Sequence, residues 1–378
     1  MVSLEGKVTI RPVVTKSDRK KFVELPWRLY RQDPHWVPPL LQDMHSTLDP
    51  QKNVLLRLGP HRHFLAERHG KTVGRLGVGM DLHLNRAKSK NLSYLTLFES
   101  IEDYAVAESL FEAGLNWLRS QGAASVSGPQ SPSNGDDYRG LLIKGFDSPP
   151  VLLNSYNPPF YMEFFDGFGF EKEFDRHAYY YDLANGPSDR LKRGVEAAQK
   201  RYGFTVRSIN LKSLQTEMLL IKDILDRSMP EWPDIIPPSL EEIEAETTKL
   251  KQLAVPDLIL IIEGPDGKPA GFSVALPDYN QVLPLMNGRL FPLGAIRFLM
   301  LKKSITGIRL FILFVTPAWR KKGVAAALYY YTMLNACRLG YTFGEGSTIH
   351  EFNTQMNLDA KKAGGELYKV YRIYRKEL

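Results

Sequence analysis

A basic stretch at residues 316–328, TPAWRKKGVAAAL, has the residue types of a phosphate site. It follows the apolar RLFILFV (309–315), which is typical of a buried strand, and leads into an alanine-rich run typical of a helix. The first N–H groups of a helix lack intrahelical partners and lie at the positive end of its dipole. We therefore expect an anionic ligand there, although the stretch alone also fits an ordinary basic helix start. The residues expected to hold it are Arg320, Lys321, Lys322, Gly323, Val324 and Ala325.

A second polar stretch, EGSTIHEFN (345–353), has the residue types of acid–base chemistry. If it is extended, Glu345, Ser347, Ile349, Glu351 and Asn353 share one face and His350 lies on the other. Two carboxylates at the open end of a sheet would bind an ammonium group or deprotonate it. The alternative is a polar strand end with solvated carboxylates. The catalytic candidates are Glu345 and Glu351, followed by His350 and Asn353.

Two further stretches are candidates for binding an acceptor molecule. SNGDDYRG (133–140) contributes Asp136, Asp137 and Arg139, and YNPPFY (156–161) contributes Tyr156 and Asn157. Ordinary polar turns and core packing are the alternatives for these two stretches. The apolar run NQVLPLMNGRLFPLGAIRFL (280–299) either lines an acyl or lipid tunnel or packs in a core.

Composition narrows the functional classes. The net charge of +7 over 378 residues fits an anionic ligand or an acidic membrane surface, and it is too small for a dedicated nucleic-acid binder. A single cysteine, Cys337, leaves no disulfide framework or thiolate metal cluster, and we expect no metal. The start of the chain lacks the pattern of a signal peptide, and no segment reaches the roughly 18 uncharged apolar residues of a spanning helix. We expect a cytoplasmic protein, with peripheral contact to the inner-membrane surface left open.

The elements that must position these residues occur twice along the chain. FLAERHGKTVGRLGV (64–78) and LIIEGPDGKPAGFSV (260–274) are both predicted hairpins with a Gly-Lys turn. Each is followed by a strand, a helix, a second strand–helix pair and an aromatic strand. This order predicts an α/β protein of two tandem domains, 1–185 and 186–378, each a mixed sheet with flanking helices.

Because of the repeat, the helix start in the first domain can be compared with the equivalent helix start in the second. EDYAVAESL (102–110) aligns with RKKGVAAAL (320–328), so that Glu102 and Asp103 replace basic residues and Ala105 replaces the glycine. An acidic pair suits the helix dipole but repels a diphosphate. We therefore expect the first domain to be a degenerate copy on the acceptor side, and the second to hold the anionic ligand.

The turn at 320–325 resembles the pyrophosphate loop of the GNAT N-acyltransferase superfamily, Arg/Gln-x-x-Gly-x-Gly/Ala. Arg320, Gly323 and Ala325 match its defined positions. The resemblance implies that the loop amides hold the pyrophosphate of coenzyme A and that the preceding strand splays to admit the pantetheine. It adds Phe314, Val315 and Thr316 to the coenzyme site, with the Phe314–Val315 backbone as the oxyanion donor.

Most of the chain is similar to tandem-GNAT bacterial acyltransferase-like proteins, a group related to bacterial ceramide synthase-type N-acyltransferases. The similarity rests on LYRQDPHWVPPL, GPQSPSNGDDYRGLLIKGFDSPP, YNPPFY, LPDYNQ with NGRLFP, and KVYRIYRKEL, in that order along the chain. It implies a tandem GNAT enzyme that transfers an acyl group from acyl-CoA to an amine, with a long-chain sphingoid-type amine as one candidate acceptor. The oligomeric state, monomer or homodimer, is left open.

One departure from the family keeps other functions open. Many members carry a tyrosine seven residues after the asparagine that Asn353 matches, and here that position is Ala360. The missing acid favours a non-catalytic, CoA-binding or regulatory protein as an alternative. An aminoacyl-tRNA-dependent peptide transferase is a further alternative, which predicts a basic RNA-binding helical arm that the sequence lacks.

Overall fold

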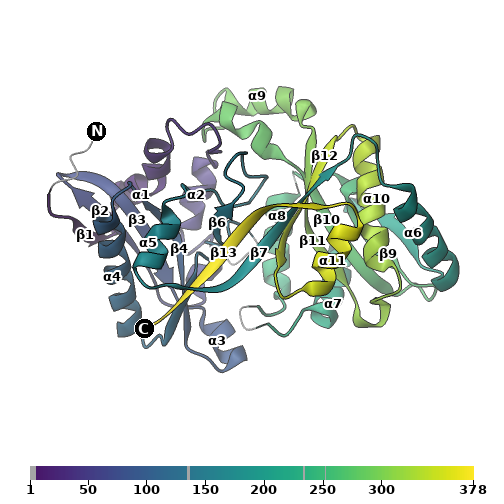
Figure 1. The fold of residues 1–378 in the computed structure, drawn as a ribbon, viewed down its shortest axis with the longest axis horizontal. Coiled ribbons are helices and arrows are strands. Elements are labelled where there is room, and N and C mark those ends of the chain that lie inside the picture. Colours follow the sequence, from purple (N-terminus) through teal and green to yellow (C-terminus); the bar gives the residue numbers. More distant parts are fainter. Residues whose placement is uncertain (1–5, 134–136, 233–234, 252) are drawn as a thin grey trace. The chain divides into compact units, whose positions relative to one another are not determined.

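The structure is a computed structural model that describes residues 6–133, 137–232, 235–251 and 253–378 (Figure 1). The chain forms two compact units. Unit 1 comprises Met1–Arg176, Asn280–Lys303 and Lys369–Leu378, and unit 2 comprises His177–Tyr279 and Ser304–Tyr368. The expected domain boundary at 185/186 follows the sequence repeat and stays a prediction. The two compact units do not follow it, since unit 1 also includes residues 280–303 and 369–378 from the second half of the chain.

Unit 1 is a mixed sheet with helices on its faces. Its strands follow the order β1-β2-β3-β4-β5-β13, with β6 also paired to β13. The β4–β5 pair is parallel, and the pairs β1–β2, β2–β3, β3–β4, β5–β13 and β6–β13 are antiparallel. Its elements are β1 (Thr9–Pro12), α1 (Lys16–Leu29), α2 (Leu41–Thr47), β2 (His61–Arg68), β3 (Lys71–Gly79), α3 (Leu82–Lys88), β4 (Leu92–Ser100), α4 (Tyr104–Ser120), β5 (Ser125–Gly128), β6 (Leu141–Lys144), α5 (Tyr161–Gly167), the start of β7 (Glu171–Asp182), α9 (Gly294–Leu301) and most of β13 (Glu366–Glu377).

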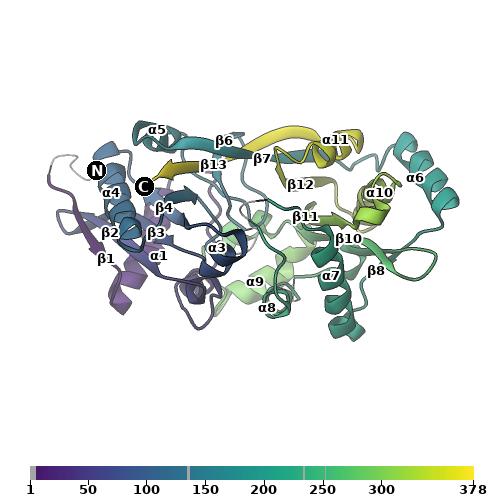
Figure 2. The same cartoon turned by 90° about the horizontal axis from the view of Figure 1, so that it is seen from below.

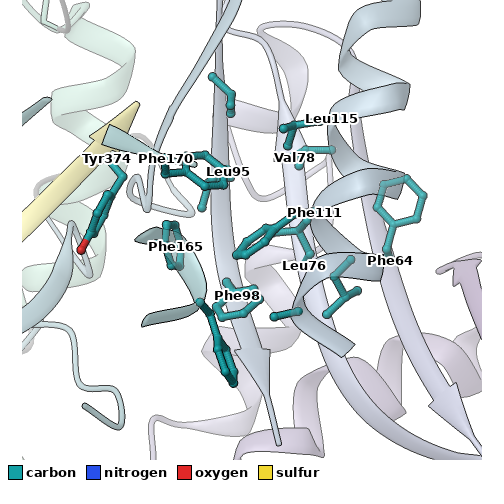
Figure 3. Packing of buried hydrophobic residues seen from close by; sticks show 14 of the residues in the cluster. Phe64, Leu76, Val78, Leu95, Phe98, Phe111, Leu115, Phe165, Phe170 and Tyr374 are labelled. Atoms are coloured by element: carbon teal, nitrogen blue, oxygen red, sulfur yellow. The ribbon is translucent and has the colours of Figure 1, made fainter. Parts of the chain in front are cut away.

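The core of unit 1 is built on one face of helix α4. Val106, Leu110, Phe111 and Leu118 are fully buried, and their three- and four-residue spacing places them on one stripe of the helix. Phe111 stacks on Phe98 of β4 with ring centroids 4.8 Å apart. Figure 3 shows this aromatic packing, in which residues of β4, α4 and α5 meet.

Unit 2 has the sheet order β7-β12-β11-β10-β9-β8, with a parallel β11–β12 pair. The apolar run of β9 is continuous because helices cover both faces of this sheet (Figure 2). Leu260 and Ile262 pack with α6 and α10, whereas Ile259 and Ile261 pack with α7 and α8. Its further elements are α6 (Asp189–Tyr202), β8 (Thr205–Ser208), α7 (Leu214–Ser228), α8 (Leu240–Leu250), β9 (Ile259–Glu263), β10 (Pro269–Pro277), β11 (Gly307–Val315), α10 (Val324–Arg338), β12 (Phe343–His350) and α11 (Thr354–Lys362).

The predicted repeat is present in both units. The hairpins are β2–β3 and β9–β10, and the strand–helix pairs are β4–α4 and β11–α10. Both units also carry an irregularity at the same place, where an extra residue enters the strand before the helix. In unit 1 the extra residue lies in β4, opposite Arg75 to Gly77 of β3. In unit 2 it lies in β11, opposite Val274 and Ala275 of β10. The predicted α/β fold of tandem units is confirmed.

Candidate active site

Strands β11 and β12 separate along their length. Their parallel register begins at Gly307 with Phe343 and ends at Leu310 with Gly346. Both strands continue, β11 to Val315 and β12 to His350, and β11 stays paired to β10 as far as Val315. The bulge at Phe311 lies where the separation starts. A wedge therefore opens between the two strands, directed toward the turn before α10.

The backbone orientation of β11 follows from its last hydrogen bond to β10. The Thr316 N–H donates to the Ala270 carbonyl of β10 at 2.9 Å. Because alternate residues of a strand direct their N–H groups to opposite neighbours, the Phe314 N–H points toward β10 and the Val315 N–H points toward the wedge. Of the two predicted oxyanion donors, Val315 has the suitable orientation.

The turn that follows β11 brings the predicted loop residues together. After a short 3-10 turn at Pro317–Trp319, Lys321 and Gly323 adopt left-handed backbone conformations, with φ of 61° and 81°. Helix α10 starts at Val324, and its first intrahelical bond is donated by the Ala327 N–H to Gly323. No side chain in the described parts of the chain caps this helix. The leading amides of α10 are thus available to an external acceptor.

The three cations of the turn differ in their surroundings. The Arg320 Nη2 donates to the Ser228 carbonyl at the end of α7, at 3.1 Å. Lys322 lies over the Trp319 ring, with Nζ 5.0 Å from its centroid, and near Tyr202. Lys321 is exposed at the tip. Arg320 therefore braces the turn, while the ammonium groups of Lys321 and Lys322 supply its positive charge.

Gly323 is required by packing as well as by backbone conformation. A Cβ on this residue would lie 2.6 Å from the Ala198 Cβ of α6. We expect Gly323→Ala to lower the free energy of unfolding by about 2–3 kcal/mol, from the strained φ and the overpacking together. The measurement is urea unfolding of the full chain.

The control for this prediction is Gly186→Ala, because Gly186 has a φ of 70° and nothing within 4 Å of an added Cβ. Gly186→Ala should lower the free energy of unfolding only through the strained backbone conformation, by about 1 kcal/mol. Adding Ala198→Gly to Gly323→Ala should restore the packing part. Equal losses in the two single variants would contradict the steric account.

The equivalent helix start in unit 1 is closed by its own side chain. Asp103 caps α4 and accepts a hydrogen bond from the Ala105 N–H at 3.0 Å. The other oxygen of Asp103 pairs with Arg68 at 2.6 Å, and the Arg68 side chain is only 2% exposed. A carboxylate thus occupies the position that a diphosphate would need.

This ion pair predicts a stability effect confined to unit 1. Asp103→Ala removes the cap and leaves the buried Arg68 without that carboxylate, so we expect a loss of about 3 kcal/mol in urea unfolding. Asp103→Asn keeps a capping oxygen and should lose less. Coenzyme A affinity, measured by calorimetry in the same variants, should stay at the wild-type value. A change in that affinity would contradict the assignment of the ligand to α10.

Glu345 lies in a buried polar network on β12. Its side chain is 1% exposed, and its carboxylate accepts hydrogen bonds from the hydroxyls of Ser347 and Tyr368. The Arg309 Nε donates to the Ser347 Oγ at 2.9 Å, and Arg309 is the register partner of Glu345. Tyr368 is half-buried, so its hydroxyl connects the carboxylate to a more accessible position.

A small cavity of about 20 Å³ borders Glu345 on the α10 side of the sheet. Tyr181 of β7 and Tyr329 and Thr332 of α10 form part of its wall. The accessible lining of the cavity is apolar, so a water molecule there would find no hydrogen-bond partner. Burial raises the pKa of both tyrosines, so they stay protonated, and their hydroxyls donate to the Ala360 carbonyl and to the Met356 Sδ.

The other predicted catalytic residues do not share a face with Glu345. Strand β12 ends at His350, Glu351 lies in the following turn, and Asn353 caps α11 by accepting from the Met356 N–H at 3.2 Å. The expected extended face over 345–353 is therefore wrong beyond His350, because the cap starts a helix. Ala360, at the position of the family tyrosine, is fully buried in α11.

His350 is buried under aromatic rings at the end of β12. Trp232 stacks on it with centroids 4.5 Å apart, and Phe352 lies 5.1 Å away. The Phe352 N–H donates to the His350 Nδ1 at 3.2 Å. A neutral imidazole here therefore carries its proton on Nε2.

The predicted acceptor residues belong to unit 1, except for Asp136, which lies outside the described residues. Asp137 accepts from the hydroxyls of Ser131 and Ser133, and Arg139 is half-buried. Tyr156 donates to Asp33 at 2.8 Å. Asn157 bonds both backbone groups of Leu142, so it holds β6 in place.

Sequence reasoning missed Arg309 and Tyr368, and it placed Ser347 on the face of Glu345 without giving it a role. A charged residue opening an apolar strand was the available signal for Arg309, which is 1% exposed. Within the described ranges, no three His, Cys, Asp or Glu side chains are grouped to hold a metal. Across the same described part of the chain, every helix is too short or too polar to cross a membrane.

Two curated proteins are similar to the chain along its whole length. No protein-family model matches the chain. It is 31% identical to protein YghO of Escherichia coli (strain K12) over 388 aligned positions, covering 100% of this chain and 97% of YghO. It is 29% identical to the bacterial ceramide synthase of Caulobacter vibrioides (strain NA1000 / CB15N), covering 100% and 99% of the two chains.

A solved structure shows the same two-unit architecture. The tandem GNAT protein from the clavulanic acid biosynthesis pathway superposes with a TM-score of 0.59 at 11% identity, covering 98% of each chain. The likeness is one of fold. It confirms the fold that the sequence resemblance implied: the chain has the tandem GNAT fold, and it belongs to the same family as YghO.

Proposed function

We propose that unit 2 binds an acyl-CoA and transfers its acyl group to an amine. The observation that carries the proposal is the wedge between β11 and β12, which leads into the uncapped, basic start of α10. The leading amides of α10 would receive the diphosphate, and Lys321 and Lys322 would add charge. The pantetheine would then lie along the free side of β11 in place of a strand partner.

The wedge also contains a hydrogen-bond donor that would act on the thioester carbonyl. The Val315 N–H, directed into the wedge, would donate to the thioester oxygen as negative charge develops on it. The amine nitrogen attacks the carbonyl carbon, a C–N bond forms, and the C–S bond breaks. The proton lost from nitrogen balances the one gained by the departing sulfur.

Glu345 is the general base that the network favours. Two hydroxyl donors hold its carboxylate in place, and the Tyr368 hydroxyl offers a route by which a proton can reach it. Glu351 lies outside β12, in the turn that follows the strand.

The acceptor class rests on the relative rather than on the site. A 29% identical protein along the full chain is a bacterial ceramide synthase, which supports a long-chain sphingoid-type amine as the acceptor. The direct test is to incubate the protein with radiolabelled palmitoyl-CoA and sphingoid amines and to follow the N-acyl product. Tight CoA binding without product for any chain length would favour the alternative, a non-catalytic CoA-binding regulator.

A further inference from the structure

The segment 280–303 between β10 and β11 has an unusual charge pattern. Its 24 residues contain four cations, Arg289, Arg297, Lys302 and Lys303, and neither aspartate nor glutamate. The remaining residues are mostly large and apolar, from NQVLPLM to FLML. Such a pairing of apolar and basic side chains without carboxylates is typical of segments that lie in a lipid interface.

Most of the large apolar side chains of this segment are exposed or half-buried, whereas Val282 and Met286 are buried. Phe291 is 77% exposed, and Met300 is 73% exposed. Six of the thirteen exposed large hydrophobic side chains in the described residues fall within these 24 positions. Core packing, one of the two alternatives for residues 280–299, therefore does not hold for these six side chains. These six form what we call the apolar patch: Leu285, Phe291, Leu293, Ile296, Leu299 and Met300.

Helix α9 (labelled in Figure 1) gives part of the patch a defined direction. Its residues are all exposed or half-buried, and Ile296, Leu299 and Met300 lie three and four residues apart on one face. The Arg297 Nη1 donates to the Leu285 carbonyl at 3.2 Å, which fixes α9 to the preceding short helix at Leu283–Met286. Lys302 and Lys303 follow directly at its end.

We propose that the apolar patch docks on an anionic lipid surface, with Ile296, Leu299 and Met300 in the interface and the basic residues on the headgroups. The positive charge of the segment favours an anionic lipid surface over a second copy of the chain. A second copy of the segment would bring eight cations together without a carboxylate from the segment itself, whereas anionic headgroups neutralise them. Apolar burial and headgroup attraction then act together.

The experiment is flotation of the full chain with vesicles of phosphatidylcholine containing 40% phosphatidylglycerol. We expect wild-type protein to float with these vesicles in low salt and to bind pure phosphatidylcholine at least tenfold more weakly. Lys302→Gln/Lys303→Gln should weaken binding about 25-fold, since each basic residue near an anionic surface contributes roughly a factor of five. Leu299→Ser/Met300→Ser should weaken it at least tenfold at the same salt concentration.

Matched controls carry the same chemical changes elsewhere. Lys16→Gln/Lys20→Gln alters two exposed lysines of α1, and Leu219→Ser/Leu358→Ser alters two exposed leucines. Both should bind vesicles like the wild type, and circular dichroism should show all variants folded. Absence of flotation with anionic vesicles, or equal losses in the controls, would overturn the proposal.

Sedimentation velocity tests the other candidate occupant of the apolar patch, a second copy of this chain. If Leu299→Ser/Met300→Ser converts a dimer into a monomer while wild-type protein ignores vesicles, the patch is a contact between copies and the lipid proposal is overturned. None of these measurements needs acyl transfer. CoA affinity, measured in parallel, should be unchanged in every patch variant, so failure here is distinct from failure of the proposed function.

Discussion

Reversing two lysine charges at the proposed diphosphate site, in Lys321→Glu/Lys322→Glu, should weaken coenzyme A binding about 100-fold in titration calorimetry. Two ammonium groups that attract the diphosphate become two carboxylates that repel it, at a helix start that already favours an anion. A loss of that size corresponds to about 2.7 kcal/mol. Arg320 is left unchanged because its bond to the Ser228 carbonyl would confuse charge with loop structure.

The matched control is Lys192→Glu/Arg193→Glu on α6, which makes the same change in net charge at two exposed positions of unit 2. It should bind coenzyme A within about twofold of the wild type, since screening by salt weakens distant charges. Raising the salt concentration should shrink the difference between the two double variants. If both lose affinity equally, the turn is no phosphate site and only net charge matters.

Glu345→Gln should lower kcat about 10²–10⁴-fold while coenzyme A binds as before. The amide keeps the shape of the carboxylate but cannot take a proton from the attacking amine. It also accepts through one oxygen only, so the hydroxyls of Ser347 and Tyr368 lose one of their two acceptor atoms. Steady-state kinetics with a saturating amine, together with CoA calorimetry, measures the two effects separately.

Two further variants show whether Glu345 acts as the base. Glu351→Gln should change kcat by less than about threefold, because Glu351 lies in the turn beyond β12. Tyr368→Phe removes a donor to the carboxylate and makes its protonation easier, so the acid limb of kcat/KM should move to higher pH. A large loss in Glu351→Gln with full activity in Glu345→Gln would reverse the assignment.

The local elements of this fold could be predicted because each is encoded within a short window. The Gly-Lys hairpins, the apolar strand 309–315 and the helix after Gly323 each show their period and their turn residue within some fifteen positions. Comparing 102–110 with 320–328 then singled out the helix start that carries positive charge. The capping of α4 by Asp103 is the structural form of that difference.

The parts that could not be predicted depend on contacts between distant residues. Tyr368 reaches Glu345 because β13 follows α11, and no pattern near either residue indicates that bond. The end of β12 is a different case. Asn353 before Thr354 is an ordinary capping signal, and it ends the alternating polar pattern that precedes it. Likewise, the apolar run 280–299 indicated burial, and only its solvent exposure distinguishes a surface from a core.

The exchange of segments between the units also sets an order of events during translation. The sheet of unit 1 takes β13 beside β5, through pairs such as Tyr374 with Gly128 and Lys376 with Val126. Residues 369–378 leave the ribosome only after all of unit 2 has been made. Until then the nascent unit 1 presents β5 as an open strand edge, the kind of edge that pairs with other chains. Chaperone capture of ribosome-bound chains should therefore persist until β13 emerges.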